Sequence, residues 1–276
     1  MAWQGEARHG WARPGQARQG QAWNLAWSGM AWQGRARPGM ARNEVVFSFF
    51  QERQVNQYEI QLEGVTPIIM HQDILAFGEK VRAWQRDPAN REHSVAGDDR
   101  SPPWTWLGFL YHNRKVVGIP SDNLMTMIRE GGAKVRTGKG QETYKKHSQS
   151  GVAIDGEQFD LYVDGREIAV ATLNDLIGNM DFNAHLEAAE AAGFELLVKR
   201  AKVGQSKHVR VRPMFRSWTA VGTLTVIDEE LSGLTQPVLT SILNQAGAMC
   251  GLGDWRPSSP KSPGSFGKFS PEIKRL

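Results

Sequence analysis

The sequence predicts an α+β fold with a split ferredoxin-like core, in which strands and helices follow the order βαββαβ. Residues 58–63 alternate apolar and polar side chains, as in a half-buried strand. Apolar residues at helical spacing follow over 122–135. Residues 194–273 then give the pattern strand, strand, helix, glycine-rich loop, strand. Insertions at about 85–103 and 136–193 separate these parts.

The first strand is followed by a helix and a long polar segment. Asp73 is a suitable cap for a helix over 74–84, where apolar residues recur at helical spacing. Residues 85–103 are polar and rich in turn formers, so we expect a mobile loop. Two more strands are expected, at 104–111 and 115–119.

The middle of the chain contains the first core helix. Ser121 or Asp122 caps it, and its apolar face runs over 122–135. Gly131 and Gly132 disfavour a helix by about 1 kcal/mol each relative to Ala, so we expect them to let another backbone approach. Two short strands are expected in the following insertion, at about 151–154 and 159–163.

The C-terminal part has the clearest pattern. Strands are expected at 194–203 and 208–227. Thr235 caps the last helix, Pro237 lies in its first turn, and Gly251 ends it. A loop rich in Gly and Pro leads to a final strand over about 266–273.

Residues 1–43 form a low-complexity segment rich in Arg, Trp and Gly. Five of the ten tryptophans lie there, and glycine recurs about every fifth residue, which matches neither a helix nor a strand. We expect the segment to be disordered when alone. It is interpreted as a sequence-tolerant nucleic-acid tail, as a translated tandem repeat before a start at Met30 or Met40, or as a segment that orders against a neighbouring subunit.

Composition excludes several classes of protein. The 276 residues include a single cysteine, Cys250, which rules out an internal disulfide and a cysteine-rich zinc site. Cys250 lies in an apolar helical pattern, which is typical of a buried thiol. No apolar run of about 18 residues is present, so no membrane span is expected. Without a signal-peptide pattern, an intracellular location is the default.

The positive charge belongs mostly to the tail. The chain has a net charge of +4, yet residues 1–43 hold six Arg and one Glu, which leaves 27 basic and 28 acidic residues elsewhere. Nucleic-acid binding by the folded part must therefore rest on local clusters.

The first cluster of cations covers residues 199–216, which contain no acidic residue. Because Arg210 and Arg212 alternate with valines, their side chains share one face of a strand. A row of cations on a hairpin suits a phosphate backbone, whereas the alternative is a solvated strand face. The predicted contacts are Lys199, Arg200, Lys202, Lys207, His208, Arg210, Arg212 and Arg216.

A second cluster lies in the glycine-containing loop after the first core helix. Only Glu142 opposes its cations, and a flexible basic loop often orders on a nucleic-acid strand, although a plain surface loop is the alternative. The cluster consists of Lys134, Arg136, Lys139, Lys145 and Lys146.

A third candidate is the loop after the last helix. Its glycines, Gly251, Gly253, Gly264 and Gly267, are expected to bring backbone N–H groups close to a phosphate. Trp255 is a candidate for stacking on a base, and Arg256 and Lys268 add charge. The loop has no Walker A pattern. A tight connection with a core Trp is the alternative.

Catalytic and metal sites have little support in the sequence. The seven histidines match no zinc motif, and Asp98 and Asp99 lack a third carboxylate. His71 is interpreted as a core or rim histidine rather than a general base. We therefore expect no enzyme activity, no cofactor and no metal.

Some motifs resemble those of the repeat-associated mysterious protein (RAMP) superfamily, whose members include backbone subunits of CRISPR effector complexes. The motifs are residues 119–124 at the start of a helix, the loop residues 251–253 and residues 264–269. Residues 65–70 and 253–257 also resemble an uncharacterised family of phage and prophage proteins.

The resemblance, which spans residues 57–273, implies one RAMP-like domain over residues 44–276 with a modified RNA-recognition-like fold. It implies binding of single-stranded nucleic acid by several copies along the strand. The family's thumb-like insertion corresponds to residues 136–170 or 194–212, and its glycine-rich loop to residues 251–269. Asp254 and the tail depart from the family pattern, and no family catalytic histidine is found.

The sequence thus predicts a single-strand binder of RNA or DNA, encoded by a phage or prophage and located in the bacterial cytoplasm. The expected partners are single-stranded nucleic acid and further copies of the chain, without a membrane. Two alternatives remain: a phage structural or assembly protein that oligomerises through the tail, and a RAMP-type endoribonuclease, for which His208 is the motivating residue.

Overall fold

The computed structural model describes residues 55–203, 205–261 and 263–276. The low-complexity segment 1–43 and its predicted disorder lie outside these described residues. The described residues form a mixed α+β fold with two antiparallel sheets, and all belong to one compact unit. No helix in this part of the chain is long and apolar enough to span a membrane.

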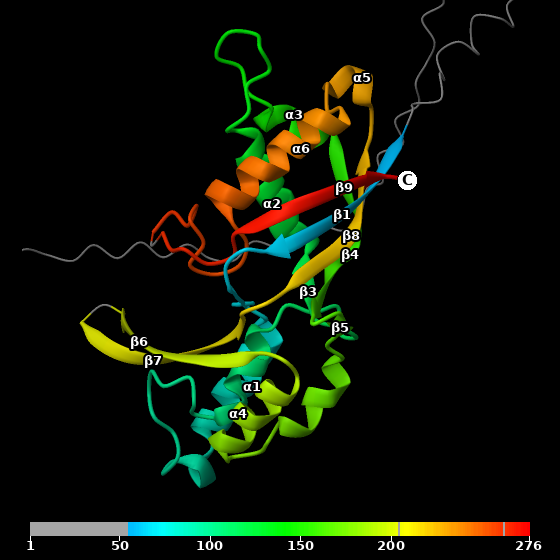
Figure 1. Ribbon diagram of the computed structural model, residues 1–276. Coiled ribbons are helices and arrows are strands. Elements are labelled where there is room, and N and C mark those ends of the chain that lie inside the picture. The colour runs from blue at the N-terminus through cyan, green and yellow to red at the C-terminus, as the bar shows by residue number, and fades with distance from the viewer. Residues whose placement is uncertain (1–54, 204, 262) are drawn as a thin grey trace, which may run out of the picture. The chain divides into compact units, whose positions relative to one another are not determined.

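The larger sheet contains the predicted first strand near its centre. Its order is β3-β4-β8-β1-β9, and each strand is antiparallel to its neighbour (Figure 1). Burial alternates along β1 because its apolar residues face the core. The strands are β1 (Asn56–Gly64), β3 (Gly118–Pro120), β4 (Val152–Val163), β8 (Thr219–Val226) and β9 (Phe269–Arg275), and β5 (Arg166–Glu167) pairs with β4.

Two helices pack together on this sheet. Helix α2 (Ser121–Gly132) contacts β4 and α6 (Gln236–Gln245), and α6 contacts β9. Helix α6 continues as a π-helical turn, Ala246–Cys250. A Cβ atom on Gly131 would lie 2.6 Å from the carbonyl oxygen of Ile242, which confirms that this glycine lets another backbone approach. The short helices α3 (Lys145–Ser150) and α5 (Glu229–Ser232) complete this part.

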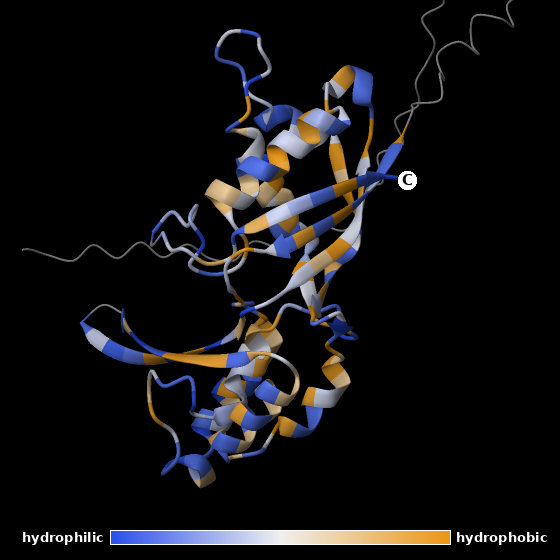
Figure 2. Ribbon diagram, viewed as in Figure 1, coloured by the Kyte–Doolittle hydropathy of each residue, from blue (hydrophilic) through white to orange (hydrophobic). Residues whose placement is uncertain are grey.

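The smaller sheet has the order β2-β7-β6. Its strands are β2 (Ile68–Ile69), β6 (Glu195–Val203) and β7 (Ser206–Phe215). The single strand expected over 208–227 is therefore two strands in different sheets, β7 and β8. They separate near Trp218, whose indole donates a hydrogen bond to the Thr66 carbonyl (2.9 Å). Figure 2 shows the apolar residues of β7 concentrated toward its C-terminal half.

Helical segments accompany the smaller sheet. They are α1 (Leu75–Arg86), α4 (Phe182–Ala191) and the 3₁₀ segments Pro88–Asn90, Pro103–Phe109 and Val170–Leu176. The strand expected over 104–111 is wrong, because Pro103–Phe109 is a 3₁₀ helix with proline in its first turn. Trp104, Trp106 and Leu107 are all buried, so the apolar run reflects burial on several sides rather than a pleated strand.

Other boundaries also differ from prediction. Ile74, not Asp73, occupies the N-cap of α1. The short strands expected at 151–154 and 159–163 are one strand, β4, with an irregularity between Asp155 and Asp160. Strand β3 begins at Gly118 rather than residue 115, and β9 begins at Phe269 rather than residue 266. The N-cap at Thr235 and the helix end at Gly251 are confirmed.

Two glycines give a matched test of this packing. A Cβ on Gly222 would lie 2.1 Å from the Phe159 ring, whereas one on Gly78 in α1 would meet no atom within 4 Å. We expect Gly222→Ala to lower the free energy of unfolding by about 1–3 kcal/mol, because Phe159 must move. Gly78→Ala should raise it by about 0.5–1 kcal/mol. Urea unfolding of both variants measures these changes in the free energy of unfolding. Equal changes in the two variants would contradict the packing described for Gly222.

Candidate nucleic-acid interface

The glycine-rich loop 251–268 is fixed against the segment that joins the two sheets. The N–H of Asp254 donates to the Ile69 carbonyl (2.8 Å), and the N–H of Gly267 donates to the Pro67 carbonyl (2.8 Å). A Cβ on Gly253 would lie only 2.4 Å from the Ile69 carbonyl oxygen. The loop is therefore held by backbone contacts that need a glycine at this position.

The same contacts occupy several donors that were expected to bind phosphate. The N–H groups of Gly251, Gly264 and Gly267 donate to the carbonyls of Ala246, Arg256 and Pro67. These three donors are engaged inside the protein, in contrast to the expectation of a phosphate-binding loop. The glycines are explained instead by close packing, since a Cβ on Gly264 would lie 1.9 Å from the Trp255 carbonyl oxygen.

Trp255 has an unusual backbone in this loop. Its φ is +51°, in the left-handed region that a bulky residue rarely adopts. Its side chain is partly exposed, and the Lys199 ammonium lies 4.9 Å from the centre of the indole ring. Strained residues of this kind persist where the surrounding structure holds them, and they are concentrated at functional sites.

The register of the β6–β7 hairpin divides the first cluster between two faces. Lys199 pairs with Arg210, and Lys202 pairs with Lys207. Paired residues share a face, and successive residues alternate. Lys199, Arg210 and Arg212 therefore lie on one face, and Arg200, Lys202 and Lys207 lie on the other. Arg210 and Arg212 share a face as predicted, but the cluster is not a single row.

Three arginines of this cluster pair with carboxylates outside residues 199–216. Arg210 and Arg212 bind the two oxygens of Asp99 at 2.8 and 2.7 Å, and Arg216 binds Glu195. Arg212 is buried, at 7% exposure. Arg210 and Arg212 are therefore poor candidates for phosphate contacts, whereas the pair of Arg216 with Glu195 lies at the surface. The absence of acids within the segment did not reveal Asp99, because Asp99 lies more than a hundred positions away.

The other four cations of the hairpin are exposed. Within the described residues, no ion pair involves Lys199, Arg200, Lys202 or Lys207. His208 differs from them because its imidazole packs against Gly97, and its buried Nδ1 has no hydrogen-bond partner there. His208 thus lies apart from the exposed cations with which it was grouped.

The second cluster forms an ordered turn after α2. Arg136 bridges to Thr143, the Thr137 N–H donates to the Glu142 carbonyl (3.0 Å), and Gly138 has a φ of +83°. All five predicted cations are exposed, and the described residues supply none of them with an ion pair. Glu142 lies instead near His147 (3.7 Å).

The loop 251–268 contacts the hairpin on one side and the C-terminal end of α2 on the other. Lys199 covers Trp255 on the hairpin side. On the other side, the Ser258 hydroxyl of the loop donates a hydrogen bond to the Glu130 carboxylate of α2 (2.5 Å), four residues before Lys134. Figure 1 shows this loop between the hairpin and the turn after α2.

We call the exposed cations together with Trp255 the basic track; of its hairpin cations, Lys199 lies on the face toward Trp255 and the other three lie on the opposite face. Arg256 is close to it but lies 3.8 Å from Glu130 and donates to Ser258 (3.0 Å). Lys268 is partly exposed at the end of the loop. The track consists of Lys134, Arg136, Lys139, Lys145, Lys146, Lys199, Arg200, Lys202, Lys207 and Trp255.

The residues that anchor the track were not singled out as a group by the sequence. The buried Arg212 guanidinium contacts Asp99 (2.7 Å), lies 3.8 Å from Asp254 and 3.4 Å from Nε2 of His71, and stacks 4.2 Å from the Phe109 ring centre. Asp254 in turn accepts a hydrogen bond from the N–H of Trp255 (2.9 Å). No spacing along the chain brings these positions together.

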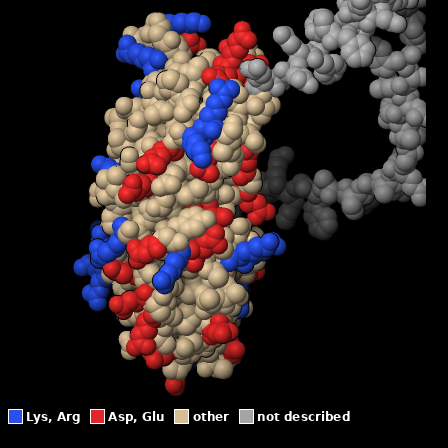
Figure 3. All heavy atoms as spheres, turned by 45° about the vertical axis from the view of Figure 1, so that its right-hand side comes forward, with Lys and Arg blue, Asp and Glu red and all other residues tan. Residues whose placement is uncertain are grey.

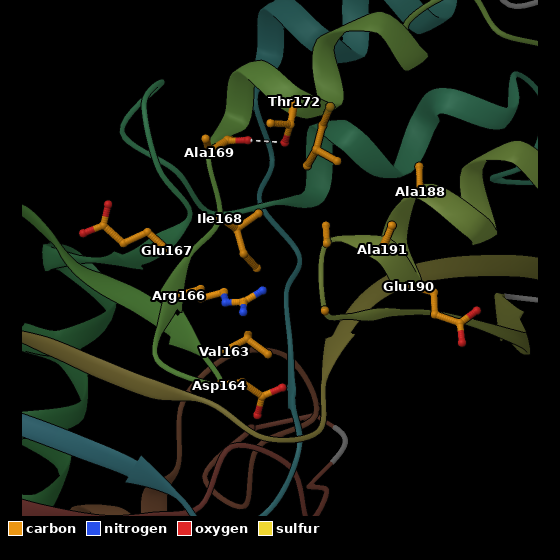
Figure 4. Close-up of a pocket in the computed structure, with 13 residues that line it drawn as sticks. Val163, Asp164, Arg166, Glu167, Ile168, Ala169, Thr172, Ala188, Glu190 and Ala191 are labelled. Atoms are coloured by element: carbon orange, nitrogen blue, oxygen red, sulfur yellow. Dashed lines mark hydrogen bonds between the residues drawn. The ribbon is translucent and has the colours of Figure 1, made fainter.

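Other surfaces lack this convergence of predicted residues. A cleft of about 740 Å³ lies between residues 163–173 and 188–193, and none of the predicted site residues lines it. Figure 4 shows Arg166 directed into this cleft and Glu190 directed away from it. On the face in Figure 3, basic and acidic side chains are interspersed. The described residues contain no group of three or more His, Cys, Asp or Glu suited to a metal ion.

His71 gives a pH test of the anchor. Burial lowers its pKa, Arg212 lowers it further, and Asp254, Asp99 and Asp73 oppose the shift. The pKa of His71 in the folded protein lies below its unfolded value of 6.5. The stability that neutral His71 contributes to the fold is therefore fully present above pH 6.5 and is lost as pH falls through the folded pKa. Wild type should thus lose more stability than His71→Gln between about pH 7.5 and pH 5. Denaturant unfolding at several pH values measures the free energy of unfolding of both proteins. A difference between them that does not change with pH would contradict this prediction.

Comparison with known proteins assigns no family to this chain. No protein-family model matches it, and the search of curated proteins gives no match.

Proposed function

We propose that this protein binds single-stranded nucleic acid along the basic track, with Trp255 stacking on a base. The observation that carries the proposal is the position of Trp255. Its backbone is strained, and its partly exposed indole lies under Lys199, in a loop that extends from the hairpin to Glu130 of α2. Neither set of exposed cations, on the hairpin or in the turn after α2, has a carboxylate partner among the described residues.

The chemistry of a single strand matches both parts of the track. Lysine and arginine side chains neutralise phosphates and release condensed counterions, which supplies affinity without sequence preference. An exposed indole offers a stacking surface for any base, but only where the base is not already stacked and paired in a duplex. A track that combines cations with an aromatic side chain therefore favours single strands over duplexes.

The arrangement of the larger sheet supports the finer fold proposal. The elements β1, α2, β4, β8, α6 and β9 follow one another in the order βαββαβ, and their strands lie in the order β4-β8-β1-β9. We propose that they form a split ferredoxin-like core, with the smaller sheet and its helices as insertions. The resemblance to RAMP proteins extends this proposal to several copies along one strand.

Salt dependence tests whether the cations of the track contact phosphates. In fluorescence anisotropy, wild type should bind single-stranded RNA or DNA more tightly than duplex DNA. Lys202→Gln combined with Lys207→Gln should reduce the slope of log K against log salt by about 0.7 per lost contact. Arg91→Gln combined with Lys274→Gln changes the net charge equally at exposed positions outside the track. Equal slopes for the two double variants would exclude the hairpin as a phosphate contact.

Substitution of Trp255 tests stacking separately from charge. Gly adopts a φ of +51° without strain, so Trp255→Gly removes the ring while it keeps the loop conformation. We expect this variant to lose about 1–3 kcal/mol of binding free energy with an unchanged salt slope. Trp255→Phe keeps an aromatic ring and should lose less. Full affinity in Trp255→Gly would exclude stacking at this residue.

A further inference from the structure

We propose that Arg212, which is too buried to reach a ligand, is the positioning residue for Trp255. This inference concerns how the proposed stacking site is built, and its consequence for affinity rests on the proposed function. The chain of contacts runs from Asp99 through Arg212 and Asp254 to Trp255.

Each contact in this chain has a defined partner. The Nη1 of Arg212 donates to Oδ2 of Asp99 (2.7 Å), while its Nε lies 3.8 Å from Oδ2 of Asp254. The other oxygen of Asp254, Oδ1, accepts the N–H of Trp255 (2.9 Å). Arg212 therefore attracts one side of the carboxylate whose other side holds the backbone of the strained tryptophan.

The position of Arg212 makes this attraction effective. Its side chain is 8% exposed, and the Phe109 ring covers the guanidinium at 4.2 Å from the ring centre. Water screens a buried charge weakly, so the charge acts on Asp254 across a distance beyond hydrogen-bond length. The N–H of Asp254 is also bound to the Ile69 carbonyl, which limits where the carboxylate can move.

Arg210 provides the matched control. It also binds Asp99, at 2.8 Å, and lies on the same face of β7, but no ion pair joins it to Asp254. A variant that lacks Arg210 and the Asp99 charge loses the same number of charges as a variant that lacks Arg212 and the Asp99 charge. Only the loss of Arg212 removes the cation beside Asp254.

The experiment compares Asp99→Asn/Arg212→Met with Asp99→Asn/Arg210→Met in the full chain. Tryptophans are labelled with 5-fluorotryptophan, and Trp255→Phe assigns the ¹⁹F resonance of Trp255. Without ligand, we expect the Arg212 variant to shift and broaden that resonance, whereas the Arg210 variant keeps the wild-type signal. With a single-stranded oligonucleotide, we expect roughly five- to tenfold weaker binding for the Arg212 variant alone.

The two readouts separate failure of this inference from failure of the proposed function. An unchanged Trp255 resonance in the folded Arg212 variant would overturn the positioning role, whatever the affinity. If wild type binds no oligonucleotide, the proposed function fails, while the ligand-free spectra still decide the role of Arg212. Should the Arg212 variant not fold, Asp254→Asn replaces it, because it keeps the acceptor for Trp255 and removes the charge that Arg212 attracts. A wild-type spectrum for Asp254→Asn would then count against the inference.

Discussion

The buried ion pair between Arg212 and Asp99 is the interaction on which the described site depends. It ties β7 to the insertion at residues 85–103, where the Val209 N–H also donates to the Gly97 carbonyl (3.0 Å). Asp99 is fully used, because Arg210 binds one oxygen while Arg212 and the Val211 N–H bind the other. Removing one partner of such a pair costs about 3–5 kcal/mol, since the remaining charge is left buried. The pair thus holds in place β7, which carries Lys207 and pairs with β6, the strand of Lys199, Arg200 and Lys202.

Local patterns predicted β1 of the larger sheet and the two helices that pack on it. The alternation at residues 58–63 corresponds to β1, and the helices expected near Ser121 and Thr235 are α2 and α6. These signals are reliable because one face of each element is buried and the other is solvated. The 3₁₀ helix at Pro103–Phe109 carries no such signal, since residues 103–108 are all buried and none of them marks a solvated face. An apolar run without a solvated face fits a strand and a buried helix equally well.

The site was predictable only as separate clusters. Lys199, Lys202 and Lys207 were identified from composition, and the structure leaves them exposed. Arg210 and Arg212 belong to the same run of basic residues, but both pair with Asp99. Only tertiary contacts distinguish these paired arginines from the exposed lysines. The division of cations between two hairpin faces follows from the register, which depends on how β6 and β7 meet at their turn. Net charge along the sequence therefore overstates the number of cations available to a ligand.

Trp255 shows how packing and proposed function combine in one residue. A glycine at this position would relieve the backbone, because a left-handed conformation costs a residue with a side chain about 1–2 kcal/mol. That cost is offset by contacts that do not involve the indole face under Lys199: the hydrogen bond to Asp254 and the close approach of Gly264. The ring packs against Phe266 with 6.3 Å between the ring centres, and Trp255 remains partly exposed. A large side chain kept in a strained conformation, on a loop that backbone hydrogen bonds already fix, fits the proposed stacking of a base on its ring.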